Sequence, residues 1–176
     1  MTTSLIGARV ARKEDYRFLT GAGQYTDDIA LPGQTYAAFV RSPHAHAVLK
    51  SVRTDRARKA PGVVAVYTGA DLAAAKVGGL PCGWLITDVK GQPMKEPPYP
   101  PLAQGKVRHV GERVAVVIAE TQAQARDAAE LVEVDYQGLP AVVNAAKARN
   151  APALHEIAPD NTCYVWALGD KGAVDA

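Results

Sequence analysis

The clearest alternation of apolar and polar positions lies between Val107 and Pro140. Residues 114–119 form a short apolar run rich in β-branched side chains, which predicts a strand buried on both faces. The next segment repeats apolar residues at helical spacing, at Ala125, Ala128, Ala129 and Val132. This spacing predicts a helix with one apolar face, and the abundance of alanine would let it approach a sheet closely.

The start of this helix has its own signal. Thr121 followed by Gln124 fits a capping box, in which the hydroxyl accepts a backbone N–H and the amide reaches back to the cap residue. Beyond the helix, Val132, Val134 and Tyr136 alternate with polar residues, which predicts a half-buried strand. The order is strand, helix, strand, and the crossover should be right-handed if both strands lie parallel in one sheet. No side chain of this unit is chemically reactive, so we interpret it as scaffold.

Shorter elements are predicted elsewhere. Strands are expected at residues 35–41, 47–52 and 63–67, and short helices at residues 56–60 and 72–76. Glycine and proline make residues 76–106 a long irregular stretch, typical of a binding loop or docking surface. Within it, the proline run at residues 96–101 resembles a polyproline ligand, but a stiff surface connection is favoured.

The two ends of the chain carry weaker patterns. The first 34 residues read as an irregular arm, with Phe18 and Leu19 as expected anchors. A last short element is expected at residues 141–148, with Tyr164 and Trp166 as later anchors. We therefore divide the chain into an arm (1–34), a folded domain (35–145) and a connection (146–176).

Composition narrows the class of protein. The chain has 176 residues, 48% of them hydrophobic and 22% charged, which suits one ordinary globular domain. A net charge of +2 without a long basic run gives no case for nucleic acid binding. No apolar run approaches the ~18 residues of a membrane span, and no secretory signal is visible at the start. A cytoplasmic location is the expectation.

Few residues offer candidate chemistry. His44 and His46 point the same way in an extended backbone and could chelate a metal, although structural histidines are favoured because His109 and His155 cannot be placed nearby. Cys82 and Cys163 have no metal-ligand spacing, and a disulfide between them is possible but not indicated.

Two further patterns in the arm are weak. Gly21 and Gly23 begin a G-x-G without the strand and helix that a dinucleotide site needs, and Asp27 with Asp28 fits a solvated turn.

The motifs of a serine hydrolase, a zinc protease or a P-loop are missing, which argues against a small hydrolase. We assign no catalytic, cofactor-binding or metal-binding residue.

Five phrases together carry a family resemblance. They are RFLTGAGQYTDDIALPG at 17–33, FVRSPHAHA at 39–47, PGVVAVYTGADL at 61–72, VGERVAVVIAET at 110–121 and DAAELVEVDYQGLPAVV at 127–143. They closely resemble the N-terminal α/β hammerhead domain of the molybdenum hydroxylase large subunit, in the xanthine dehydrogenase, aldehyde oxidase and carbon monoxide dehydrogenase family. Large chains of the carbon monoxide dehydrogenase type look most similar. The resemblance implies an α+β fold, with a mixed sheet, two main helices packed on it and long irregular loops.

The resemblance also implies a context. Large subunits of this family bind molybdopterin, often as the cytosine dinucleotide, and use water as the oxygen donor to a small substrate such as CO, an aldehyde or an N-heterocycle. Electrons then pass to 2Fe-2S clusters and FAD on partner subunits. The family's catalytic glutamate and cofactor loops lie downstream and have no counterpart here, while residues 169–176 resemble the connection toward them.

Two functions remain open. The first is a non-catalytic hammerhead domain, a fragment or split chain that covers the cofactor domain and contacts partner subunits through residues 76–106 and the arm. The alternative is a free-standing binding or assembly module of the same fold without enzyme activity.

Overall fold

The computed structural model describes residues 6–169 and 171–174, and it divides the chain into two compact units, Met1–Gln34 and Thr35–Ala176. The first unit contains helix α1 (Asp15–Leu19) and the 3-10 turn η1 (Thr26–Asp28), elements that the sequence had not predicted. Phe18 stacks on Tyr25 with ring centroids 5.8 Å apart, but Leu19 is 86% exposed. The prediction of Leu19 as an anchor is therefore wrong within the described arm.

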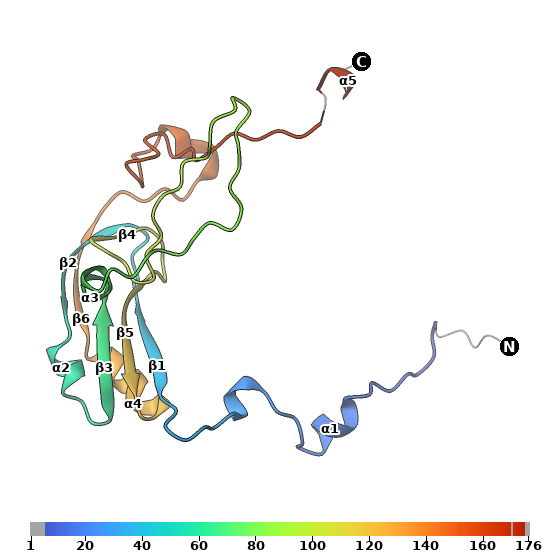
Figure 1. Ribbon diagram of the computed structural model, residues 1–176, viewed down its shortest axis with the longest axis vertical. Coiled ribbons are helices and arrows are strands. Elements are labelled where there is room, and N and C mark those ends of the chain that lie inside the picture. The colour runs from blue at the N-terminus through green and yellow to red at the C-terminus, as the bar shows by residue number, and fades with distance from the viewer. Residues whose placement is uncertain (1–5, 170, 175–176) are drawn as a thin grey trace. The chain divides into compact units, whose positions relative to one another are not determined.

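The second unit contains two three-stranded antiparallel sheets (Figure 1). The first sheet has the order β1 (Tyr36–Arg41), β5 (Arg113–Ala119), β3 (Val63–Thr68). The second has the order β4 (Lys106–Val107), β2 (Ala47–Arg53), β6 (Glu133–Gly138). Three predicted strands thus match β1, β2 and β3 to within a residue, whereas the two-residue β4 is too short to leave a pattern.

The predicted strand, helix, strand order is confirmed as β5, α4 (Gln122–Glu130) and β6. The expectation of one mixed sheet is wrong, because β5 and β6 lie in different sheets, and the condition for a right-handed parallel crossover is therefore not met. Strands β1 and β3 occupy both edges of β5, so β6 has no free edge there and pairs with β2 instead. The α+β fold class is retained with two sheets in place of one.

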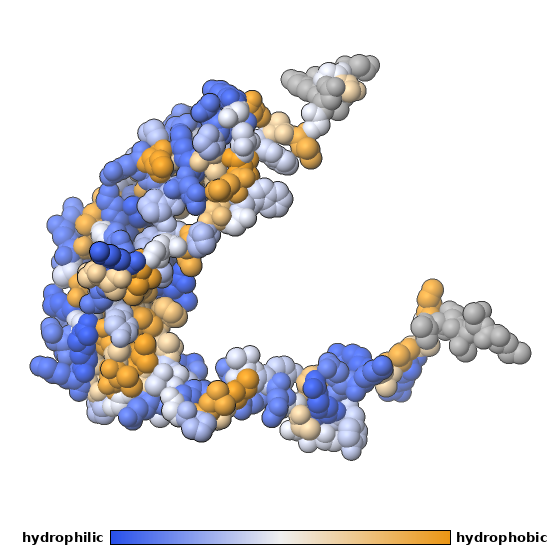
Figure 2. Space-filling view, viewed as in Figure 1, coloured by the Kyte–Doolittle hydropathy of each residue, from blue (hydrophilic) through white to orange (hydrophobic). Residues whose placement is uncertain are grey.

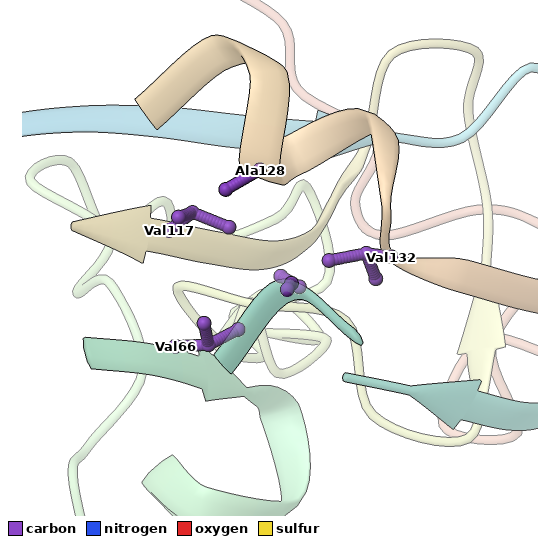
Figure 3. Close-up of a cluster of buried hydrophobic side chains, with 6 residues drawn as sticks. Val66, Val117, Ala128 and Val132 are labelled. Atoms are coloured by element: carbon purple, nitrogen blue, oxygen red, sulfur yellow. The ribbon is translucent and has the colours of Figure 1, made fainter. Parts of the chain in front are cut away.

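Helix α4 buries its alanine face against the first sheet. Figure 3 shows Val117 of β5, Val66 of β3, Ala128 of α4 and Val132 after α4 in one apolar cluster. Each of these side chains is at most 9% exposed. The small Ala128 lets the helix backbone lie close to β5, as the sequence predicted.

A second cluster fills the space on the other face of β5. It consists of Ala47, Ala103, Val107 and Val114, with Val134 and Tyr136 of β6 packed against it. Val114 joins this cluster while Val117 joins the first, so β5 is covered on both faces. The prediction of a strand buried on both sides is confirmed, and its burial accounts for the continuous apolar run.

Three helices pack on the sheets, at the three places where the sequence predicted a helix. Helices α2 (Asp55–Arg58) and α3 (Gly69–Ala74) both contact β3, and α4 contacts β1 and β5. Helix α3 starts earlier than predicted because Thr68 and Asp71 form a reciprocal capping box. At α4 the hydroxyl of Thr121 does accept the backbone N–H of Gln124, at 3.2 Å. The amide of Gln124, however, accepts from that hydroxyl instead of reaching back, so only half of the predicted box forms.

The irregular stretch lies beside the C-terminal segment. The backbone N–H of Val89 donates to the carbonyl of Val165, and that of Lys95 to the carbonyl of Cys163, each at 2.9 Å.

The short element predicted at residues 141–148 appears as the 3-10 helix η2 (Ala145–Asn150), and α5 (Lys171–Val174) follows near the end. Tyr164 and Trp166 stay 42% and 57% exposed, so they do not anchor the described chain. No helix of the described residues has the length and apolar character to cross a lipid bilayer.

Candidate functional site: a buried polar cluster beside an apolar loop face

The turn between β1 and β2 is closed by its own polar groups. Ser42 is buried, and its hydroxyl accepts the backbone N–H of His44 at 3.0 Å and lies 3.1 Å from the carbonyl of the same residue. The backbone N–H of Ser42 donates to the carbonyl of Glu112, while that of Gly111 donates to the carbonyl of Ser42. These contacts join the turn to the residues that lead into β5. Pro43 lies in the turn, outside β1 and β2, where no ladder hydrogen bond needs its missing N–H.

The two histidines of this turn take different partners. The ring of His44 is exposed and lies against Tyr136, with centroids 4.8 Å apart. His46 is 8% exposed, and its Nδ1 lies 2.8 Å from the carbonyl oxygen of Pro140. The Nε2 of His46 is buried without a hydrogen-bond partner among the described residues. The side chains therefore do not converge as the chelating pair considered from the sequence would require.

Glu112 is the buried carboxylate of this region, at 6% exposure. Its Oε2 accepts the backbone N–H of Arg108 and lies 3.6 Å from Nδ1 of the exposed His109. A buried carboxylate needs such partners, because leaving it without donors would be strongly destabilising. The side chain of Glu112, which precedes β5, thus binds the backbone of Arg108, which follows β4, and so links the two strands.

Arg108 and His155 extend the cluster to the C-terminal segment. The Nε of Arg108 donates to the carbonyl of Leu154 at 2.9 Å. Burial lowers the pKa of His155 below its ordinary value, the cation of Arg108 lowers it further, and the carboxylate of Glu112 opposes both. At the edge of the same region, burial raises the pKa of Tyr136, against an opposing hydrogen bond with Ser42. We call Ser42, His46, Arg108, Glu112 and His155 the buried polar cluster; Ser42, His46 and Glu112 are buried, and Arg108 and His155 are half-buried.

The cluster lacks the arrangement of a catalytic or metal centre. In the part of the chain that the structure describes, no three His, Cys, Asp or Glu side chains lie together as metal ligands would. Cys82 and Cys163 are both free thiols, so the disulfide that the sequence left open does not form. The polar groups of the cluster mostly bind backbone carbonyls and N–H groups, which indicates that they hold segments together.

The remaining sequence candidates lie in the arm. Asp28 accepts the backbone N–H of Tyr25 at 2.9 Å, and Asp27 is exposed, as a solvated turn predicts. Gly23 lies against the ring of Phe18, where an added Cβ would come within 2.8 Å of the ring. That contact gives Gly23 a packing role and does not resemble a phosphate-binding loop.

A second feature is a group of exposed apolar side chains on the irregular stretch and the C-terminal segment beside it, where Figure 2 shows separate hydrophobic patches among hydrophilic residues. We define this apolar loop face by its exposed large side chains: Leu80, Trp84, Leu85, Val89, Tyr99, Tyr164, Val165, Trp166 and Leu168. A hollow of about 440 Å³ within it is lined by residues that include Leu80, Met94 and Tyr99. Large exposed apolar side chains on two paired segments favour an interaction site here.

Sequence reasoning missed Ser42, Glu112 and Asn161 as organising residues. Glu112 stands just before an apolar strand, where a charge gives no hint of burial without the fold. Asn161 has a left-handed backbone (φ 55°), and its side-chain amide donates to the carbonyls of Ala148, Ala151 and Pro152. The sequence Pro-Asp-Asn at 159–161 is typical of a turn, but nothing local indicates the three carbonyl partners of Asn161.

Comparison with known proteins decides the family. The family described as aldehyde oxidase and xanthine dehydrogenase, a/b hammerhead domain, matches residues 20–140. The chain belongs to this family. The hammerhead fold expected from the sequence phrases is therefore confirmed, with β1 to β6 and α2 to α4 inside the matched range or at its edge.

Relatives of the hammerhead domain are large subunits. The carbon monoxide dehydrogenase large chain of Afipia carboxidovorans is 40% identical over 97% of this chain and 22% of its own length. The nicotine 6-hydroxylase large subunit of Paenarthrobacter nicotinovorans is 38% identical over 92% of this chain and 19% of its own length. The chain thus spans about a fifth of the length of these curated relatives.

Solved structures agree. The crystal structure of the Cu,Mo-CO dehydrogenase has a TM-score of 0.73 and 38% identity, covering 96% of this chain and 22% of that chain. Quinoline 2-oxidoreductase from Pseudomonas putida 86 has a TM-score of 0.67 and 42% identity, over 79% of this chain and 17% of that chain. The hammerhead domain described here therefore has the same fold as a domain of these enzymes.

Proposed function

We propose that the chain is a non-catalytic scaffold domain of a molybdenum hydroxylase large subunit. The observation that carries the proposal is the family match over residues 20–140, together with relatives about five times longer that are named as large subunits. The parent enzyme would oxidise a small substrate, CO, an aldehyde or an N-heterocycle, with water as oxygen donor. It would work in the cytoplasm with an iron–sulfur subunit and an FAD subunit, and its molybdopterin would be the cytosine dinucleotide form.

The described residues do not fit the cofactor itself. Molybdopterin carries phosphate, which favours clustered N–H donors and arginines. The hollow between the irregular stretch and the C-terminal segment, about 550 Å³, is lined by two carboxylates, Asp88 and Asp160, and by two lysines, Lys90 and Lys95. Lys95 is already paired with Asp160 at 3.5 Å. The carboxylates balance the lysines and the lining contains no arginine, so the hollow does not favour a phosphate, and we assign cofactor binding and catalysis to other parts of the large subunit.

The apolar loop face is our candidate for the contact with the cofactor-binding part of the large subunit. Trp84 is 76% exposed and Trp166 57% exposed, and the backbone pairing of Val89 with Val165 joins the segments on which they lie. Tryptophans at the centre of an interface commonly carry 2 kcal/mol or more, which is about 30-fold in affinity. The size of these side chains therefore makes this face an effective docking surface.

The test is co-expression of the tagged chain with the rest of the large subunit and with the proposed iron–sulfur and FAD subunits. We expect a stable complex to co-purify, and we expect Trp84→Ser and Trp166→Ser each to reduce recovery at least tenfold. Val64→Ser is the matched control, because Val64 is exposed on β3 outside the apolar loop face. Equal recovery of all variants would refute the docking assignment.

The same experiment distinguishes the alternative function, a free-standing module, from the scaffold domain. A free-standing binding or assembly module would be purified without any large-subunit partner, while still folding as a hammerhead domain. Circular dichroism of the purified chain supplies the control for folding. Failure of co-purification by a folded chain would favour this alternative over the scaffold proposal.

A further inference from the structure

One face of the first sheet is covered over only part of its length. Helix α4 packs on the face that carries Ala115 and Val117. On the opposite face the second apolar cluster includes Val114, but neither apolar cluster includes Val116 or Ile118. In Figure 2 hydrophobic side chains gather over β3 and β5. The apolar run of β5 thus extends beyond the part of this face that the described residues cover.

The uncovered residues lie in register across all three strands. Phe39 of β1 and Tyr67 of β3 both pair with Val116 of β5. In the adjacent row, Ala37 and Ala65 both pair with Ile118. Residues directly opposite each other on neighbouring strands point to the same face of a sheet. We call the following residues the open sheet face: Ala37, Phe39, Ala65, Tyr67, Val116 and Ile118.

The open sheet face does not have the composition of a face made for water. Phe39 is 44% exposed and Tyr67 43% exposed, and none of the six residues is charged or an amide. An antiparallel sheet with one solvated face usually alternates apolar residues inward with polar residues outward. An apolar face left open in this way indicates that a further element packs on it.

The open area is too small to hold a second copy of the chain by itself. An aromatic side chain contributes about 200 Å², so Phe39 and Tyr67 each leave roughly 90 Å² open. With the smaller shares of the aliphatic residues the face offers about 300 Å², whereas a stable complex of separate chains buries about 800 Å² on each partner. A segment of the same large subunit needs less area, because the rest of that subunit holds it nearby at a high effective concentration.

A single helix has the dimensions of this face. Three strands at a spacing of about 4.8 Å span roughly 10 Å, which matches the diameter of a helix. Helix α4 covers the other face of the same sheet in this way. The large-subunit relatives have most of their length outside the region that this chain matches, and that length can supply such a helix.

Arg41 adds a charge at one end of the face. Its guanidinium carbon lies 5.7 Å from the centroid of the Phe39 ring, and its Nη1 donates to the carbonyl of Gly111 at 2.9 Å. Among the described residues Arg41 forms no ion pair. A guanidinium has five N–H donors, so Arg41 retains donors for a carboxylate.

We propose, on the basis of the scaffold function above, that the open sheet face binds an amphipathic helix of the large subunit that lies outside this chain. The helix places an apolar stripe on Phe39, Val116 and Tyr67, and an Asp or Glu of the helix pairs with Arg41. Helices on both faces then bury β5 along its whole length, as its continuous apolar run predicts.

Photo-crosslinking in the co-expressed complex tests this contact. p-Benzoylphenylalanine at position 39 or 67 keeps an aromatic ring on the face, and the same residue at position 64 is the control. Val64 is exposed on β3 but lies at a register shift and pairs with no residue of β5. We expect positions 39 and 67 to crosslink to one segment of the large subunit, with apolar residues at helical spacing and an Asp or Glu beside them. The yield from position 64 should be at least about fivefold lower.

Substitutions measure the two parts of the contact separately. Phe39→Ser and Tyr67→Ser should each weaken binding of the remaining large subunit about tenfold or more, as aromatic residues at interface centres do. Arg41→Glu should weaken it by about tenfold through like-charge repulsion, whereas Arg41→Lys should retain most of the affinity. Circular dichroism checks that each variant is folded, and crosslinking from position 39 decides the matter if a serine variant is not.

The outcomes distinguish this surface from the scaffold function itself. If the wild-type chain recovers no large-subunit partner, the scaffold function fails and the open sheet face fails with it. If the complex forms but positions 39 and 67 give no crosslink, only the open sheet face is overturned. Crosslinks to a second copy of this chain, or to the iron–sulfur or FAD subunit, would also overturn it.

Discussion

Gly69 at the start of α3 offers a sharp test of how tightly the second unit is packed. A Cβ added at Gly69 would lie 2.1 Å from the carbonyl oxygen and 2.9 Å from the carbonyl carbon of Ala103. Both atoms belong to the backbone, so no side-chain rotation can relieve the clash. Ala103 is itself buried, and its N–H donates to the carbonyl of Arg113 at 2.7 Å. Gly69→Ala must therefore displace either α3 or the residues that lead into β4.

The expected loss of stability can be estimated from two opposing effects. Overpacking costs about 1–3 kcal/mol, and we expect about 2–3 kcal/mol here because both clashing atoms belong to the backbone. Alanine in place of glycine in a helix returns up to about 1 kcal/mol. The net change in the free energy of unfolding should be a loss of about 1–2 kcal/mol. With a urea m-value of about 2 kcal/mol/M, the unfolding midpoint should fall by about 0.5–1 M.

The assay is urea unfolding followed by circular dichroism, with Gly78→Ala as the matched control. Gly78 has no positive φ, and an added Cβ would meet no atom within 4 Å. Its replacement should shift stability by less than about 1 kcal/mol, in the stabilising direction. If Gly69→Ala and Gly78→Ala unfolded at the same urea concentration, the close approach of α3 to Ala103 would be refuted.

Three further predictions concern the core, a cap and acid stability. Val117→Ala removes two methyl groups from a fully buried site and should cost about 2–3 kcal/mol in urea unfolding, whereas Val64→Ala on the exposed face of β3 should cost little. Thr121→Ala should cost about 1 kcal/mol, because the hydroxyl caps α4, and Thr121→Ser should retain most of that stability. The hydrogen bond from the Thr68 hydroxyl lowers the pKa of Asp71, so its stabilising contribution is present above about pH 4 and lost as pH falls further. Asp71→Asn should flatten that acid loss when unfolding free energies are measured from pH 6 to pH 3, and an unchanged slope would contradict this reasoning.

Local patterns were sufficient for most elements of the domain. Strand β5, helix α4 and strand β6 were predicted to within two residues, because each has a distinct periodicity and Thr121 marks the helix start. Which strands pair with one another could not be predicted from such local patterns. The neighbour of β5 at Ala119 is Tyr36 of β1, and no local property of either segment specifies that contact. The choice of two sheets over one follows from long-range competition for the edges of β5.

The candidate site was likewise predictable only in its local features. The sequence identified the turn with His44 and His46 but gave no means of placing His155 in the same cluster. The sequence could not indicate that Glu112 is buried. A buried carboxylate needs hydrogen-bond donors, and the donor here, the backbone N–H of Arg108, is placed beside Glu112 only by the folded chain. The exposure of Trp166 was mispredicted because an aromatic residue in a connection can equally serve a core or an interface.

Cofactor content of the purified chain tests the central claim of a scaffold without its own reactive machinery. Molybdenum would be measured by mass spectrometry and pterin by fluorescence after oxidation, on protein made in a host that synthesises the cofactor. The scaffold account predicts that neither reaches a stoichiometric level and that no substrate is oxidised with an artificial electron acceptor. One molybdenum and one pterin per chain, or measurable oxidation of a substrate, would contradict it.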